Sequence, residues 1–162
     1  MIHYLTKEDP ALLDQDFAIL VKIWANLRGL EHALHDNGSI TTRDQMVSFA
    51  IGFNRSRAEF DFVDVGGGKE NADSKMRRML VLHYHNLHCK KIFFAGCHDT
   101  GYIHDLKEWH GMEEAEQRIV LVETTPAEPR FKELGFPITR FASVFPRHTI
   151  ATSWAKARSG LN

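Results

Sequence analysis

The sequence is poor in cysteine, since Cys89 and Cys97 are the only two in 162 residues. This count excludes a disulfide framework or a multi-cysteine zinc module built from this chain alone, so we expect no zinc. An excess of one charge is also lacking, because the formal net charge is −1 with neutral histidines. The chain therefore carries no overall positive field that would attract nucleic acid, although a local basic patch is compatible with a balanced total.

Long apolar runs are missing as well. The stretch Phe17–Val21 is interrupted by Lys22 and is far too short to span a membrane. The first ten residues lack the basic-then-apolar layout of a secretory signal. We therefore expect an intracellular protein, cytoplasmic or nuclear, that has no membrane partner. The sequence leaves its oligomeric state open.

An apolar share of 43% and eleven phenylalanines indicate a packed interior. Apolar runs alternate with amphipathic segments, which predicts an α/β fold: a three-layer sandwich around a mostly parallel sheet of about five strands. The predicted strands are residues 17–25, 60–65, 92–95, 118–123 and 138–144, and the predicted helices are 27–35, 43–54, 71–87 and 102–109. We expect this domain to cover residues 17–146, between a remnant segment at 1–16 and a flexible tail at 147–162.

Four carboxylates follow the predicted strands. Asp64 closes one strand, Glu70 and Asp73 open the helix after it, and Asp99 opens the helix after the next strand. Because parallel strands end at one edge of a sheet, we expect these groups to converge there and to hold Mg²⁺ or Mn²⁺. Such a site can activate water for phosphodiester hydrolysis. The alternative is that Asp73 and Asp99 only favour their helix starts and Asp64 is a turn residue.

A glycine run, Gly66 to Gly68, separates the second predicted strand from its helix. The spacing fits neither the phosphate loop of nucleotide triphosphatases nor the dinucleotide fingerprint. The exposed amides of Gly67 and Gly68, with Lys69 at the helix start and Lys75 nearby, form a candidate phosphate site. A flexible strand-to-helix turn explains the same residues. An enzyme that acts on small phosphate esters at this turn is a further, weaker alternative.

Histidine and cysteine give two more candidates. His98 lies beside Asp99 and is expected at the same edge of the sheet, as a site residue or as a turn residue. On a continuous helix His85, His88 and Cys89 would share one face, which fits a metal edge or, more commonly, a polar helix end. Cys97 has only His98 as a local partner, so nucleophilic catalysis is poorly supported. Basic residues such as Arg77 and Arg78 fit phosphate binding or an ordinary solvated face.

Several motifs occur in the order typical of one family. They are Val21–Leu30 (VKIWANLRGL), Gly52–Ser56 (GFNRS), Phe60–Gly66 (FDFVDVG) with Lys69 and Glu70, Ala72–Lys75 (ADSK), Phe93–Tyr102 (FFAGCHDTGY) and Leu134–Pro137 (LGFP). Through these motifs the chain resembles the uncharacterised N-terminal domain of fungal tandem CCCH zinc-finger proteins. It is more distantly similar to the NYN branch of PIN-like nucleases.

The resemblance implies a PIN/NYN-like fold in which Asp73 and Asp99 match acids of the nuclease centre. Gly101 stands where a second acid of the Gly-Asp-Ser-Asp signature is expected. The family's opening strand, with its Asp-Gly-Asp turn, and the zinc fingers have no counterpart here, which we interpret as a truncation or a remnant. We therefore expect a non-catalytic binding or regulatory module that associates with RNA or with a protein partner. The alternative is a Mg²⁺-dependent ribonuclease.

Overall fold

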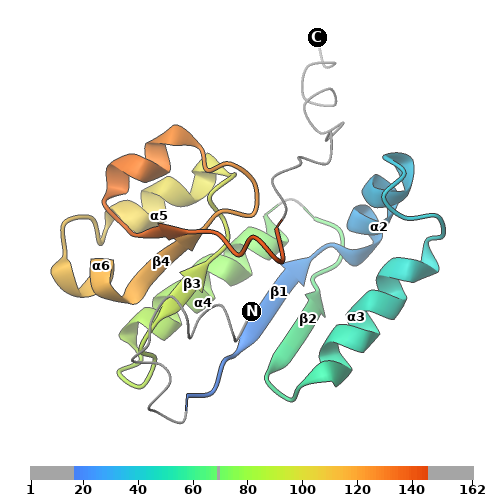
Figure 1. Ribbon diagram of the computed structural model, residues 1–162, viewed down its shortest axis with the longest axis horizontal. Coiled ribbons are helices and arrows are strands. Elements are labelled where there is room, and N and C mark those ends of the chain that lie inside the picture. The colour runs from blue at the N-terminus through green and yellow to red at the C-terminus, as the bar shows by residue number, and fades with distance from the viewer. Residues whose placement is uncertain (1–16, 69, 146–162) are drawn as a thin grey trace. The chain divides into compact units, whose positions relative to one another are not determined.

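The computed structural model describes residues 17–68 and 70–145, and Figure 1 shows their helices and strands. These residues form two compact units, one that ends at Lys75 and one that begins at Met76. We call them the β1–β2 unit (residues 17–68 and 70–75) and the β3–β5 unit (residues 76–145). The predicted remnant segment, the predicted tail and Lys69 lie outside the described residues.

The β1–β2 unit contains two parallel strands, β1 (Val21–Ala25) and β2 (Phe60–Asp64). Parallel strands need a long crossover, and here it consists of two helices, α2 (Leu27–Asp36) and α3 (Asp44–Ser56). Both strands end at the same edge, because the last residue of β1 lies opposite Asp64, the last residue of β2. This edge carries the segments that enter α2 and α4.

The core of the β1–β2 unit is small. Its fully buried apolar residues, among those described, are Met46, Ala50 and Phe62, against which Leu30 and Leu34 of α2 pack. The strands themselves are only half-buried over most of their length. Large apolar side chains remain exposed on this unit, and they are Leu20, Val47, Phe49 and Ile51.

One side chain of α3 completes the outer edge of β2. The Asn54 side chain accepts a hydrogen bond from the Phe62 backbone amide and donates one to the Phe62 carbonyl, 3.3 Å away. An amide side chain thus takes the place of a neighbouring strand at this point of the ladder. Such cover satisfies an edge whose open amides and carbonyls would otherwise pair with another chain.

The β3–β5 unit has a three-stranded parallel sheet in the order β3 (Ile92–Phe94), β4 (Ile119–Val122) and β5 (Ile138–Thr139). The connections are helical: η2 (Thr100–Tyr102), α5 (Ile103–Lys107) and α6 (Glu113–Arg118) before β4, and η3 (Pro129–Leu134) after it. All four residues of β4 are buried, as expected for the central strand of a parallel sheet. Around them lies a continuous core that includes Phe94, Leu106, Trp109, Phe131 and Phe136.

Helix α4 (Asn71–His85) begins in the β1–β2 unit and continues in the β3–β5 unit. Leu80 is buried, and Met76 and Tyr84 pack against the core of the β3–β5 unit. The last carbonyls of α4 and of the turn after it are bound by Arg118, whose Nη2 lies 3.0 Å from the Asn86 oxygen and 2.9 Å from the Cys89 oxygen. A guanidinium at this place satisfies carbonyls that a helix end leaves unpaired.

The α/β class and the parallel pairing that the sequence predicts are confirmed. The described strands form two parallel sheets, of two and three strands, so the single sandwich with about five strands stays a prediction. The domain boundaries at residues 17 and 146 also stay predictions. Within residues 17–68 and 70–145, every helix is too short or too polar to cross a lipid bilayer.

Several predicted boundaries are wrong. The first strand begins at Val21, not at residue 17, because the ladder starts where the Val21 amide bonds to the Glu59 carbonyl, 3.0 Å away. Strand β5 ends at Thr139, and the chain then turns where the Val144 amide donates to the Phe141 carbonyl. The helix predicted over residues 71–87 ends at His85, and Leu87 beyond this end is 81% exposed.

Helix α6 was not predicted at all. Its sequence is mostly charged, and Ala115 is its one buried residue, so it shows no apolar periodicity. Side-chain pairs four residues apart support it instead, since Gln117 donates to Glu113 and Arg118 to Glu114.

Candidate functional site

The carboxyl ends of β1 and β2 border a hollow on the surface of the β1–β2 unit. Its volume is about 560 Å³, and its lining consists of Asn26, Arg28, Gly29, His32, Asp64, Gly66 and Gly67. These residues come from the start of α2 and from the turn after β2, as expected for the carboxyl edge of a parallel sheet. We call this site the β1–β2 hollow.

Asp64 holds the two sides of the β1–β2 hollow together. Its Oδ1 accepts hydrogen bonds from the Leu27 amide at the start of α2 and from the Gly66 amide in the glycine turn, both at 3.0 Å. The two amides lower the pKa of the Asp64 carboxyl below its usual value. This side chain is therefore an ionised group with a turn role at neutral pH, which agrees with the structural alternative given for it above.

Besides the Leu27 amide, two more amides at the start of α2 are satisfied from within the chain. Asn26 Oδ1 accepts from the Gly29 amide at 3.0 Å, and the Asn26 carbonyl accepts from the Leu30 amide at 2.9 Å. The positive charge in the hollow therefore comes from the Arg28 side chain. Arg28 and His32 lie four residues apart on α2, both exposed, and both line the hollow.

The glycine turn presents exposed backbone to the same hollow. Gly66, Gly67 and Gly68 are all exposed, and Gly68 adopts a φ of 144°, a conformation that L-amino acids avoid. A Cβ on Gly68 would also lie 2.6 Å from Asn71 Nδ2, which donates to the Gly67 carbonyl at 3.3 Å. Glycine at this position is thus needed for the turn, and Asn71 holds the turn in place.

The remaining predicted residues of the β1–β2 unit lie at the start of α4. The Glu70 carbonyl accepts the first helical hydrogen bond, from the Ser74 amide at 2.9 Å, and Glu70 has a φ of 69°. Asp73 is half-buried in the first turn of α4, where a negative charge favours the helix dipole. Lys75 is exposed on the same helix.

Asp99 belongs to the other unit, after β3. Its Oδ1 accepts from the Gly101 amide at 2.9 Å and caps η2, which confirms the predicted cap. His98 beside it is exposed. The four predicted metal ligands are therefore divided, with Asp64, Glu70 and Asp73 in the β1–β2 unit and Asp99 in the β3–β5 unit, and their convergence stays a prediction.

A guanidinium lies beside the Asp99 turn. Arg77 Nε donates to Asp105 Oδ2 at 2.9 Å, its Nη2 lies 3.5 Å from the Gly101 carbonyl oxygen, and its Cζ lies 5.3 Å from the centroid of the Tyr102 ring. A Cβ on Gly101 would come within 3.2 Å of Asp99 Oδ1 and 3.3 Å of Arg77 Nη2. The interpretation of Arg77 as part of a solvated face is wrong, since this half-buried cation pairs with an acid and an aromatic ring.

The histidine and cysteine candidates do not form the predicted helix face. Helix α4 ends at His85, so His88 and Cys89 lie in the following turn, where Arg118 rather than an imidazole binds the carbonyls. Burial raises the pKa of the Cys97 thiol to about 11, which keeps it protonated at neutral pH. In the part of the chain that the structure describes, no three His, Cys, Asp or Glu side chains are grouped so that they could hold a metal ion.

Two basic residues that line the β1–β2 hollow were not among the predicted ones. Arg28 and His32 follow the end of the first strand directly, so their position after a parallel strand is the signal that could have indicated them. No local signal indicates the contacts of Arg77, because its partner Asp105 is 28 residues away along the chain. Lys69, predicted to bind phosphate, lies outside the described residues.

Comparison with known proteins gives one result. The chain belongs to DUF7923, a domain of unknown function whose family model matches residues 1–145. No curated protein and no solved structure matches it.

Proposed function

We propose that this member of the DUF7923 family binds RNA through the β1–β2 hollow and does not cleave it. The observation that carries the proposal is the pairing of Arg28 and His32 with the exposed glycine turn around one concave site. Arginine forms two parallel hydrogen bonds to a phosphate, and backbone amides of a glycine turn donate to the same group. Phosphate contacts of this kind supply most of the affinity of sequence-independent RNA and DNA binding.

The acids support a structural role better than a catalytic one. Asp64 Oδ1 accepts hydrogen bonds from the Leu27 amide at the start of α2 and from the Gly66 amide of its own turn, and Asp99 Oδ1 accepts one from the Gly101 amide. Beside Asp99 the Arg77 guanidinium supplies positive charge, with its Nη2 3.5 Å from the Gly101 carbonyl oxygen. These roles explain both aspartates without a metal ion, which is why we favour a binding module over a nuclease.

The finer features of the proposal rest on the resemblance described above. We infer a single PIN/NYN-like sandwich with about five strands, from a protein of the fungal CCCH zinc-finger type. In that arrangement Gly67, Gly68, Lys69 and Lys75 contribute further phosphate contacts beside Arg28. A protein partner at the same edge would give the module a regulatory role.

A Mg²⁺- or Mn²⁺-dependent ribonuclease is the second candidate. The position of Asp64 favours it, because a carboxylate at the carboxyl edge of a parallel sheet is the kind of ligand that a hard cation needs. In this case Asp73 and Asp99 act with Asp64 and Glu70 on one ion or ion pair, and His98 assists. Cleavage would then require the metal and would be lost in Asp99→Asn.

The test is a titration of fluorescently labelled single-stranded RNA, read by anisotropy at several salt concentrations. Arg28→Ala is expected to weaken binding by roughly tenfold and to reduce the salt dependence by about one counterion. Arg43→Ala serves as the matched control, since Arg43 is exposed on the same unit and does not line the hollow. Equal binding of the two variants, or no binding by the wild type, would reject the proposal.

The same samples separate the two candidates. We expect the RNA to stay intact on a denaturing gel after incubation with Mg²⁺ or Mn²⁺. Metal-dependent cleavage that is absent in Asp99→Asn and in Asp64→Asn would establish the nuclease instead. Cleavage that persists in both variants would come from a contaminant.

A further inference from the structure

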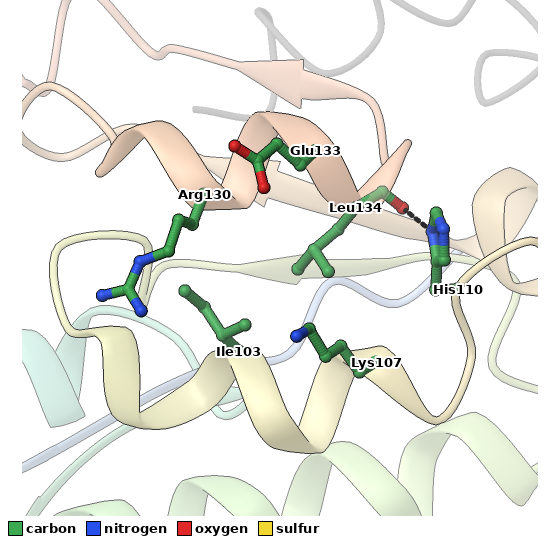
Figure 2. Close-up of a pocket in the computed structure, with 6 residues that line it drawn as sticks. All are labelled: Ile103, Lys107, His110, Arg130, Glu133 and Leu134. Atoms are coloured by element: carbon green, nitrogen blue, oxygen red, sulfur yellow. Dashed lines mark hydrogen bonds between the residues drawn. The ribbon is translucent and has the colours of Figure 1, made fainter.

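We propose that the β3–β5 unit carries a second site, which binds small organic anions with an apolar body. The site is a pocket of about 320 Å³ between α5 and η3, lined by Ile103, Lys107, His110, Arg130, Glu133 and Leu134. Figure 2 shows α5 below the pocket and η3 above it, with side chains of both helices directed into the space between them. We call it the α5–η3 pocket; it shares no residue with the β1–β2 hollow.

The floor of the α5–η3 pocket is apolar and rigid. Ile103 and Leu134 are 7% and 3% exposed, and both belong to the main core of the unit. A side chain already fixed by core packing loses little freedom when a ligand covers it. The floor is therefore suited to an alkyl or aryl group, because the free energy gained by burying such a group grows with its apolar area.

The rim of the pocket carries two cations. The Lys107 ammonium makes no hydrogen bond or ion pair with any described residue, and it is drawn near the centre of the pocket in Figure 2. Arg130 pairs with Glu128 through its Nε at 3.2 Å, which leaves its two terminal nitrogens for another acceptor. A carboxylate or a phosphate monoester seated over the floor would lie between these two donors.

The other two polar groups limit which anion fits. His110 Nδ1 lies 2.9 Å from the Leu134 carbonyl oxygen, which can only accept, so Nδ1 carries the proton and Nε2 remains for a ligand. Among the described residues, the Glu133 carboxylate makes no ion pair with either cation of the pocket, and it opposes a second negative charge. The geometry therefore favours a singly charged carboxylate over a doubly charged phosphate.

The size of the pocket agrees with a small ligand. Ligand pockets span about 300–1,000 Å³, and the α5–η3 pocket is at the lower end of that range. An RNA strand or a folded protein would contact it only with one projecting group. We therefore infer that the ligand of the α5–η3 pocket is a small molecule such as a short fatty acid or an aryl carboxylate.

The experiment uses hexanoate as the probe and the full chain as the target. Saturation-transfer NMR is expected to detect binding of hexanoate to the chain. The backbone amide shifts near Ile103 and Leu134 are expected to change with hexanoate concentration and to reach a plateau. Hexanol, which lacks the charge, and acetate, which lacks the apolar body, serve as matched ligands. If either binds as tightly as hexanoate, or if the shifts lie elsewhere in the chain, the proposal is overturned.

Three variants of exposed residues then test the charges. Lys107→Glu is expected to weaken hexanoate binding by more than roughly tenfold, whereas Glu133→Gln is expected to strengthen it by roughly threefold. Lys132→Ala is the control, because Lys132 is exposed on η3 and does not line the pocket, and its affinity should not change. Weaker binding in Glu133→Gln, or equal losses in Lys107→Glu and Lys132→Ala, would contradict the assignment. Neither result depends on RNA binding at the β1–β2 hollow.

Discussion

Both units of this chain join parallel strands through helices, but they differ in how deeply the strands are buried. In the β3–β5 unit, β4 is buried along its whole length, and a core of aromatic and aliphatic side chains surrounds it. In the β1–β2 unit, most strand residues are half-buried and the buried core is Met46, Ala50 and Phe62. The larger core stabilises the β3–β5 unit, whereas the β1–β2 unit, with its smaller core, carries the β1–β2 hollow. Stability and the candidate RNA site therefore depend on different parts of the sequence.

The largest expected effect tests this difference in burial. Leu121→Ala removes a side chain that is 0% exposed at the centre of β4 and should cost about 3–5 kcal/mol of unfolding free energy. Leu34→Ala makes the same change at a half-buried position on α2 and should cost about 1–2 kcal/mol. Urea denaturation followed by fluorescence measures both. Equal costs would contradict the comparison.

The next effect concerns the end of α4. Arg118→Ala removes the guanidinium that binds the Asn86 and Cys89 carbonyls, pairs with Glu114 and lies over the Tyr84 ring. We expect a loss of about 2–3 kcal/mol, because the carbonyls are left without a charged donor. Arg78→Ala, at an exposed position of α4, should change the free energy of unfolding by less than about 0.5 kcal/mol. Thermal denaturation of both variants separates the specific contacts of Arg118 from loss of a charge.

The glycines of the two turns should respond differently. Gly68→Ala places a Cβ 2.6 Å from Asn71 Nδ2 at a φ of 144°, so we expect a loss of about 1–3 kcal/mol and weaker RNA binding. The new Cβ of Gly101→Ala would lie 3.2 Å from Asp99 Oδ1 and 3.3 Å from Arg77 Nη2. This substitution should cost about 1 kcal/mol of unfolding free energy or less.

Gly52→Ala is the control for these substitutions. It lies within α3 with nothing within 4 Å of its Cβ position, and should stabilise the chain by about 0.5–1 kcal/mol. If Gly52→Ala and Gly68→Ala have the same effect, the glycine turn has no conformational requirement.

The smallest effect is the pH dependence from Asp64. Its pKa is lower in the folded chain than in the unfolded chain, so its contribution to stability is present above the unfolded value and is lost as the pH falls through the folded one. Unfolding free energy should therefore decline below about pH 4. Asp64→Asn keeps an amide-oxygen acceptor without the charge and should show a shallower decline. An unchanged slope in Asp64→Asn would show that the Leu27 and Gly66 amides do not stabilise the ionised carboxylate.

Much of the fold could be predicted from apolar patterns. The strand predicted over 118–123 contains the buried β4, whose residues are all apolar, and the amphipathic segment predicted as a helix over 27–35 is α2. Helix α6 was missed because charge pairs, rather than an apolar stripe, stabilise it. Strand β1 was extended too far because the ladder with β2 begins at Val21, and the apolar residues just before it pair with no strand of residues 17–68 and 70–145.

The candidate sites were predictable only in part. The positions of Asp64 at the end of β2 and of Asp99 after β3 were predicted correctly, because the apolar runs that form the strands show where the strands end. Their hydrogen bonds to turn amides could not be predicted, since these depend on the conformation of a few loop residues. The pairing of Arg77 with Asp105 joins distant parts of the sequence, and no local pattern encodes it.

The central claim is that the β1–β2 hollow, and not the Asp99 turn, contacts RNA. The most direct measurement is a titration of the ¹⁵N-labelled chain with single-stranded RNA, followed through backbone amide shifts. We expect the largest shifts at residues 26–32 and 66–68, with little change at residues 98–102. Shifts concentrated at residues 98–102, or absent from the glycine turn, would contradict the claim.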